Sequence, residues 1–179
     1  MAEGKKENWL NYLALTTVIL AVCATLATFK GGGYSTRSVL AQSQASDLWS
    51  FYQAKSIKMY IYEIQKEKLE FDLREKRQKL PAAIVADYEN KIKDYAQKIE
   101  KYTAEKTKIE KDAKEHENTR DVAKKHSQEF GMAVIFLQIA ILLSSIAALL
   151  KKKPVWLIVL LSGCVGIFYF VNGFMLFVK

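Results

Sequence analysis

Residues 74–88 read REKRQKLPAAIVADY, and Pro81 stands at their centre. Proline is tolerated in the first turn of a helix but disrupts a helix interior. One helix should therefore end near Lys79 or Leu80, and another should begin at Pro81. The sequence predicts two helical arms of nearly equal length, joined by a turn near residues 78–82.

Both arms carry apolar residues at alternating steps of three and four, which is the spacing of a coiled-coil seam. Tyrosine and lysine dilute this seam, and the first arm has a second apolar row beside it. One partner helix cannot cover both rows, so we expect the first arm to pack on the second arm and on a neighbouring subunit. The candidate oligomer interface consists of Leu48, Tyr52, Ile57, Ile61, Ile64, Phe71, Tyr88, Ile92, Tyr95, Ile99, Tyr102 and Ile109.

Charged residues of both signs are interleaved along the arms. The whole chain has 27 Lys and Arg against 19 Asp and Glu, a formal net charge of +8. Acidic residues repeatedly precede basic ones by four positions, as Glu89 precedes Lys93, which stabilises a solvated helix. A nucleic-acid interface would instead need a basic surface with interleaved aromatic residues, so we expect no nucleic-acid partner.

Three uncharged apolar runs flank the arms, at residues 9–29, 130–150 and 155–178. A helix needs about 20 apolar residues to cross a bilayer. We therefore predict an all-α membrane protein with three transmembrane helices and a long antiparallel coiled-coil hairpin, residues 38–129, inserted between the first and second. A secretory signal is the alternative for the first run, but the run is long for that role, and we expect it to remain uncleaved.

Glycine positions predict where the arms separate from the spans. Glycine is costly in a helix interior, so the triplet Gly31-Gly32-Gly33 predicts a hinge at residues 30–37. Before the second span only Gly131 is comparable. The second arm and the second span are therefore compatible with one continuous helix.

The short basic loop at residues 151–154 indicates the orientation. Basic residues in short loops favour the cytoplasmic side, which places this loop and residues 1–8 in the cytoplasm and the hairpin on the far side. Five basic residues flank the spans from the other side and favour the reverse: Lys30, Arg37, Arg120, Lys124 and Lys125. We expect the N-terminus inside and the hairpin outside.

No arrangement of residues in the sequence is typical of an active site. Cys23 and Cys164 lie within apolar runs, where a small packing residue is the expected role. His116 and His126 do not have the four-residue spacing of a helical zinc pair. Phosphate-binding loops and nucleophile motifs are absent from the sequence. We predict a non-enzymatic protein without a cofactor or metal.

Polar residues inside the apolar runs need hydrogen-bond partners in lipid. They can hold helices together, or they can line a narrow pore in an oligomer. The candidates are Thr17, Thr28, Gln138, Ser144, Ser145 and Asn172.

The predicted tip of the hairpin is apolar, because residues 80–86 read LPAAIVA. These side chains can pack the turn together, or they can present an apolar surface to another protein. The residues available to such a partner are Leu80, Pro81, Ile84 and Val85.

Residues 45–58, ASDLWSFYQAKSIK, resemble the signature of the uncharacterised bacterial membrane proteins grouped as domain of unknown function 4337. Residues 9–11, 136–141 and 172–174 are also similar to that family. The resemblance implies a bacterial cytoplasmic-membrane protein and gives no activity.

The resemblance draws attention to Asp47, Trp49, Tyr52, Gln53 and Lys55. Asp47 is a possible helix-start residue, and Trp49 and Tyr52 are candidates to anchor at the lipid headgroups. Alternatively, Asp47 and Lys55 pair across subunits.

The sequence favours a homo-oligomeric membrane protein whose hairpins form a scaffold or a platform for partners. Its expected partners are the lipid bilayer and further copies of itself. The alternative is a pore or channel, with the hairpins forming a vestibule over a ring of spans.

Overall fold

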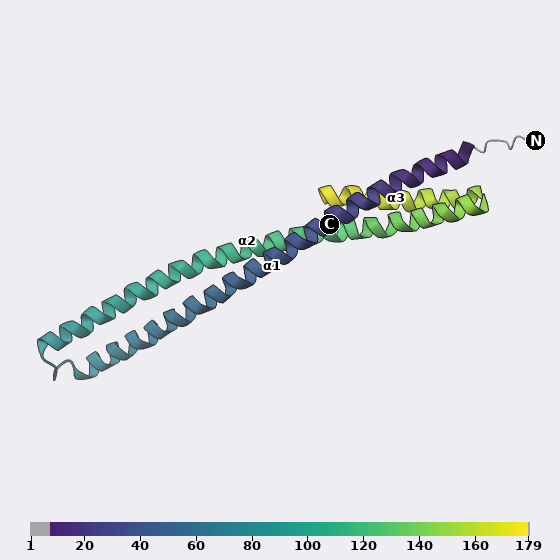
Figure 1. Cartoon of the computed structure of the whole chain (residues 1–179). Helices are drawn as coiled ribbons and strands as arrows, with labels where there is room; N and C mark the ends of the chain where they lie inside the picture. Colours follow the sequence, from purple (N-terminus) through teal and green to yellow (C-terminus); the bar gives the residue numbers. More distant parts are fainter. Residues whose placement is uncertain (1–7, 179) are drawn as a thin grey trace, which may run out of the picture. The chain divides into compact units, whose positions relative to one another are not determined.

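The computed structural model describes residues 8–178, so the predicted cytoplasmic segment at residues 1–8 lies almost wholly outside the described residues. Three helices make up nearly all of the described chain: α1 (Asn8–Lys76), α2 (Ala82–Leu150) and α3 (Lys153–Met175) (Figure 1). Residues 8–178 contain no strand. The all-helical prediction is confirmed, and each helix contains an apolar stretch long enough to cross a membrane.

The predicted hinge at residues 30–37 is wrong, because α1 continues through it without a break. Each glycine costs a helix interior about 1 kcal/mol relative to alanine, and packing against α2 offsets that cost at Gly31. A Cβ atom at Gly31 would lie 3.0 Å from the Cβ atom of Phe130, so a larger residue would push the helices apart. The Gly31 carbonyl also accepts a hydrogen bond of 3.1 Å from the Ser127 hydroxyl.

The turn between α1 and α2 surrounds Pro81, as its position in the sequence indicated. α1 ends at Lys76, a few residues earlier than expected. The backbone amides of Ile84 and Val85 donate to the Pro81 carbonyl, at 3.0 and 3.1 Å, and so begin α2. α2 then continues as one helix to Leu150, as the absence of a strong breaker predicted.

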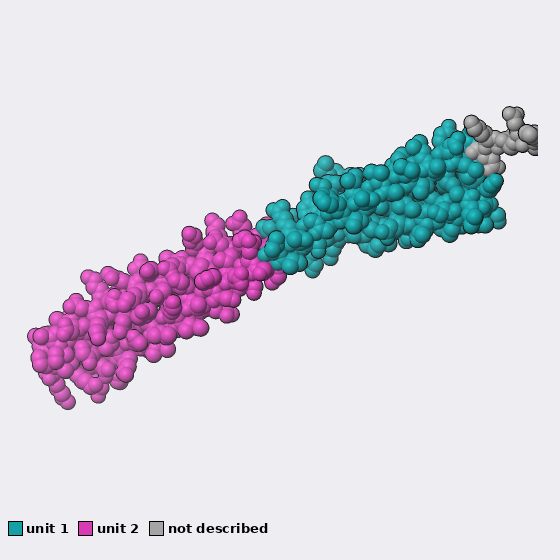
Figure 2. All heavy atoms as spheres, viewed as in Figure 1, with its two compact units in different colours: residues 1–40, 119–179 teal, residues 41–118 magenta. Residues whose placement is uncertain are grey.

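The described residues form two compact units (Figure 2). Unit 1 comprises residues 8–40 and 119–178, and therefore parts of α1 and α2 with all of α3. Unit 2 comprises residues 41–118, the remaining parts of α1 and α2. The two units differ in composition, since the apolar runs lie in unit 1 and most charged residues lie in unit 2.

The core of unit 1 surrounds Phe130 and Leu137 of α2, which are both fully buried. The Phe130 ring stacks on Tyr34 of α1, with 6.0 Å between ring centroids, and meets Phe174 of α3 edge-on at 4.9 Å. Phe130 thus contacts both other helices. Smaller side chains complete most of this core: Leu20, Ala24, Ala27, Ala133, Ala140 and Val159.

Glycines let α3 approach the other two helices closely. A Cβ atom at Gly166 would lie 2.8 Å from the Cγ atom of Leu137, and one at Gly173 would lie 2.9 Å from the Phe130 ring. Gly163 similarly faces Leu20, at 3.1 Å. Small residues that allow such approach are typical of helices that pack in lipid, where van der Waals contact replaces the hydrophobic effect.

In unit 2 the segments of α1 and α2 lie side by side and run in opposite directions (Figure 1). The Tyr62 ring contacts Tyr95 at 5.4 Å and Tyr102 at 5.9 Å between centroids. Nearer the turn, the guanidinium of Arg77 pairs with the carboxylate of Glu89 at 3.0 Å. The buried side chains of unit 2 are few and mostly small: Ala41, Ala45, Met59, Leu73 and Ala113.

Replacing Gly166 by leucine should destabilise unit 1 by about 1–3 kcal/mol, the usual cost of overpacking a tight contact. The new side chain would collide with Leu137 and its backbone amide, which leave no space for a Cβ atom. The measurement is the unfolding midpoint of the purified chain in mixed micelles, titrated with a denaturing detergent and followed by circular dichroism.

Gly131→Leu is the matched control, because a Cβ atom at Gly131 meets nothing within 4 Å. It should leave the midpoint unchanged or raise it slightly, since leucine favours a helix more than glycine does. Equal midpoints for the Gly166 and Gly131 variants would contradict the close approach of α3.

Candidate functional site

Part of the predicted oligomer interface remains exposed in unit 2. Ile57, Ile61, Ile64 and Phe71 have exposed fractions of 60%, 47%, 66% and 65%. We call these four residues the outer row. At about 100° per residue, they lie on the side of α1 opposite to Tyr62 and the other residues that contact α2. The second apolar row, which we expected from the sequence to lie beside the first, therefore lies on the opposite side of α1, and α2 covers only the first row.

The remaining predicted interface residues lie half-buried between α1 and α2 within the chain. They are Leu48, Tyr52, Tyr88, Ile92, Tyr95, Ile99, Tyr102 and Ile109. We call the surface between the two segments of unit 2 the inner seam. The structure thus places these residues in an intrachain contact, and it leaves only the outer row free for another molecule.

Lysines of the inner seam stack on its tyrosines. The ammonium of Lys55 lies 5.3 Å from the centre of the Tyr102 ring, and that of Lys98 lies 5.1 Å from the Tyr62 ring. Lys106 approaches the Tyr52 ring at 4.8 Å. Each such contact contributes about 0.5–1 kcal/mol where it is exposed. Lys55 and Lys106, which interrupt the apolar heptad pattern, therefore help to hold the seam together.

An ion pair crosses the inner seam between Lys55 and Glu105, at 2.5 Å. The hydrogen bond from Lys55, with further attraction to Lys101, lowers the pKa of the Glu105 carboxyl below its ordinary value. Since Lys55 has this partner within the chain, pairing with Asp47 of another subunit is not needed to neutralise it. Sequence reasoning did not identify Glu105, because only the antiparallel register brings it opposite Lys55.

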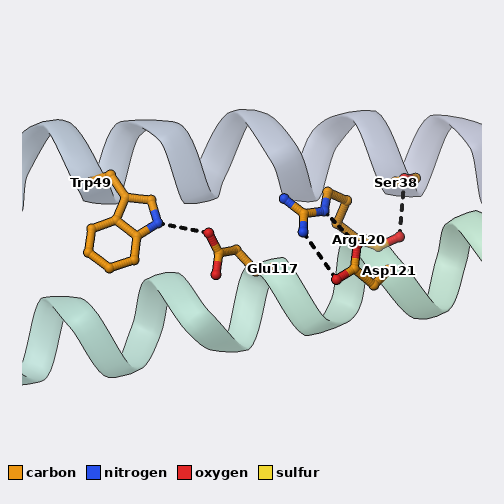
Figure 3. Close-up of polar contacts among 5 residues, drawn as sticks. All are labelled: Ser38, Trp49, Glu117, Arg120 and Asp121. Carbon is orange, nitrogen blue, oxygen red and sulfur yellow. Dashed lines mark hydrogen bonds and ion pairs between the residues drawn. The ribbon is translucent and has the colours of Figure 1, made fainter.

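The family signature residues lie in the middle of α1. Asp47 is an interior residue of this helix, so its predicted role as a helix-start residue is wrong. The Trp49 indole donates a hydrogen bond of 3.0 Å to Glu117 of α2 (Figure 3). The Trp49 ring also meets Tyr52 edge-on, with 5.4 Å between ring centroids. Asp47 and Gln53 are both exposed. Glu117 is a second partner that sequence reasoning missed.

Figure 3 also shows a polar contact within unit 1. The Ser38 hydroxyl of α1 donates to the Arg120 carbonyl of α2 at 3.1 Å, and the Arg120 guanidinium pairs with Asp121 at 2.8 Å. The hydrogen bond from Arg120 lowers the pKa of the Asp121 carboxyl. The Ser38 bond joins α1 to α2, whereas the Arg120–Asp121 pair lies within α2.

The polar residues of the apolar runs divide into partnered and unpartnered groups. The hydroxyls of Thr17 and Thr28 donate to backbone carbonyls one turn earlier, at 2.8 and 2.9 Å, and Ser145 does the same at 3.2 Å. Within residues 8–178, the buried Ser144 hydroxyl has no hydrogen-bond partner. The exposed Gln138 side chain likewise makes no hydrogen bond to any described residue.

Asn172, the remaining residue of this set, is buried at the end of α3. Its side-chain amide donates to the Glu129 carboxylate at 2.7 Å, and its carbonyl oxygen accepts from the Val178 amide at 3.0 Å. The adjacent Gly173 carbonyl accepts from Nδ1 of His126 at 2.8 Å. Sequence reasoning missed Glu129 and His126 as partners of the C-terminal end of α3.

The predicted tip is partly exposed. Leu80 and Val85 are half-buried, whereas Pro81 and Ile84 are exposed. Residues 8–178 contain no group of His, Cys, Asp and Glu side chains that could hold a metal ion.

Acidification should weaken the inner seam through Glu105. Its pKa is lower in the folded chain than in the unfolded chain, so its stabilising contribution is present above the unfolded pKa and is lost as the pH falls through the folded pKa. The thermal midpoint of the chain in detergent, followed by circular dichroism, should fall between about pH 7 and about pH 3, and Glu105→Gln should reduce this dependence.

Glu100→Gln is the matched control, because Glu100 is exposed and forms no ion pair among the described residues. It should keep the wild-type pH dependence. A Glu105→Gln variant with the same dependence as wild type would show that the Lys55 pair does not stabilise the seam.

A family model described as a domain of unknown function, DUF4337, matches residues 9–176, nearly the whole chain. No curated protein and no solved structure matches the chain. The match spans α1 and α2 and reaches the end of α3, and it includes the residues that form the inner seam. The chain therefore belongs to the DUF4337 family.

Proposed function

We propose that this chain is a non-enzymatic, homo-oligomeric membrane protein whose coiled-coil hairpins assemble into a scaffold. The observation that carries the proposal is the outer row, an exposed apolar stripe along a helical segment rich in charged residues. Separate features of the chain support insertion in a membrane, contact between copies and the orientation.

Membrane insertion is supported by the apolar surface of unit 1. Large side chains such as Leu15, Leu142 and Leu161 are exposed at 58%, 66% and 70%, on all three helices. A helix that is apolar on its outer face as well as in its core is suited to lipid. Three spans account for this surface without another protein.

A second copy of the chain is the best occupant for the outer row. Charged residues of both signs flank it, for example Lys58 and Glu67, which suits a surface that pairs with itself. The four side chains are exposed by 47–66%, so burying the exposed part yields about 3–8 kcal/mol per copy, and association in solution costs about 4–15 kcal/mol. The outer row alone therefore supports weak association, and confinement in a membrane would strengthen it.

Gln138 adds a contact between spans. It lies two turns before Ser145 on the same face of α2, and both are exposed. A side-chain amide without a partner in hydrocarbon favours a hydrogen bond to a neighbouring helix, which is worth about 0.6–2 kcal/mol. Self-association through α2 would supply that partner.

The basic residues of a short loop support the proposed orientation, and the family resemblance supports the proposed location. The basic residues Lys151, Lys152 and Lys153 form a short loop between two apolar helices, which favours the cytoplasmic side. We place the N-terminus in the cytoplasm, the hairpin in the periplasm and the protein in a bacterial inner membrane, the location that the family resemblance implies.

A pore is the second candidate, and one groove favours it. A groove of about 470 Å³ in unit 1 is lined mostly by apolar residues, and Thr17, Ser144 and Ser145 add three hydroxyls to it. In a ring of subunits these hydroxyls, together with Gln138, would line an axis below a vestibule of hairpins. Thr28 does not line this groove, and the buried Asn172 amide is bonded to Glu129, so both are less suited to that role. Ion flux through purified protein in liposomes separates a pore from a scaffold.

Introducing charge into the outer row should dissociate the oligomer. Ile61→Glu with Ile64→Glu places two carboxylates at the proposed contact, where they would repel the same residues of a second copy. The mass of the detergent-solubilised complex, from light scattering and native mass spectrometry, should fall from an oligomer to a monomer.

Phe51→Glu is the control, because Phe51 is equally exposed, at 61%, and lies on another face of α1. It should preserve the oligomer. A monomeric wild-type chain would sink the scaffold proposal, and unchanged mass in the double variant would remove the outer row from the interface.

A further inference from the structure

A shallow groove lies on the surface of α1 in unit 1, at the end of the first apolar run. Its volume is about 620 Å³, and residues that line it include Gly32, Gly33 and Tyr34. A Cβ atom at Gly32 or Gly33 would meet nothing within 4 Å, so these glycines are not required by packing inside the chain. The missing side chains leave a hollow in the exposed surface of the helix.

Two basic residues border this groove. Lys30 is the first charged residue after the apolar run, and Arg37 follows it by two helical turns on the same face. Helical side chains lean toward the N-terminus, so Arg37 leans back over Gly33. Both side chains are exposed, and neither forms an ion pair with any residue among 8–178. A hollow bordered by two unpaired cations attracts an anion.

We propose that this groove binds the phosphate of an anionic phospholipid, between Lys30 and Arg37. Val22, Leu26 and Phe29 are exposed on the preceding turns of α1, where the acyl chains would lie. Basic residues at the end of a span are suited to lipid headgroups. A second copy of the chain is a poor occupant, because symmetric contact would bring the same cations together. The inference rests on the proposed membrane insertion and is independent of the oligomer.

The test uses the full chain reconstituted in vesicles of phosphatidylcholine and phosphatidylglycerol in equal parts. The chain is extracted in mild detergent, and native mass spectrometry measures the phosphatidylglycerol retained per chain. Lys30→Gln with Arg37→Gln should lower retention by about fivefold for each charge removed. Gly33→Leu should also lower it, because the new side chain fills the groove without changing the charge.

Two control variants match these changes on α2. Lys124→Gln with Lys125→Gln removes the same charge beside the second apolar run, and Gly131→Leu adds the same side chain at another open glycine. Both should retain phosphatidylglycerol at the wild-type level. Equal losses of phosphatidylglycerol in the Lys30/Arg37 and Lys124/Lys125 variants would contradict the proposed site and indicate binding by general surface charge. Wild-type retention of the lipid in Gly33→Leu would exclude the groove as the binding site.

Two further arms test for a free-anion site and for membrane insertion. Excess inorganic phosphate in the detergent should not displace the lipid; displacement by phosphate would mean a site for a free anion. Release of the chain from vesicles by alkaline carbonate would refute membrane insertion itself. A chain that resists carbonate but retains both lipids equally would refute only the lipid site.

Discussion

Phe130 is the side chain on which the packing of unit 1 depends. It is fully buried, its ring contacts α1 through Tyr34, and it contacts α3 through Phe174. The backbone of each neighbouring helix has a glycine where the ring and its Cβ atom lie, at Gly31 and Gly173. One large side chain, which faces a glycine on each neighbouring helix, therefore sets how closely the three helices approach.

Unit 2 is built on a different principle. Two helices alone cannot enclose a dry core, and its inner seam uses residues with an apolar stem or ring and a polar end. The ammonium groups of Lys98 and Lys55 illustrate this, since they lie over the rings of Tyr62 and Tyr102. Because such a seam covers only one side of α1, the outer row stays exposed.

The sequence predicted the features that depend on local pattern. Pro81 indicated the turn, and the uncharged runs indicated three long apolar helices. Prediction from the sequence failed where a contact with a residue distant in the chain decides the local structure. The glycine triplet is helical because Gly31 packs on Phe130, and Asp47 caps nothing because α1 does not begin there. Likewise, the partners Glu105 and Glu117 are distant in sequence and become neighbours only through antiparallel packing.

The scarcity of buried side chains in unit 2 affects how stability is distributed along the chain. The free energy of local opening is lower where few buried apolar groups become exposed. Backbone amide hydrogens in such regions therefore exchange with solvent sooner. The segments of α1 and α2 around Tyr62 should therefore open more often than those around Phe130, although each belongs to the same unbroken helices. A helix that is continuous in geometry is thus divided into a rigid part and a part that separates from its neighbour more readily.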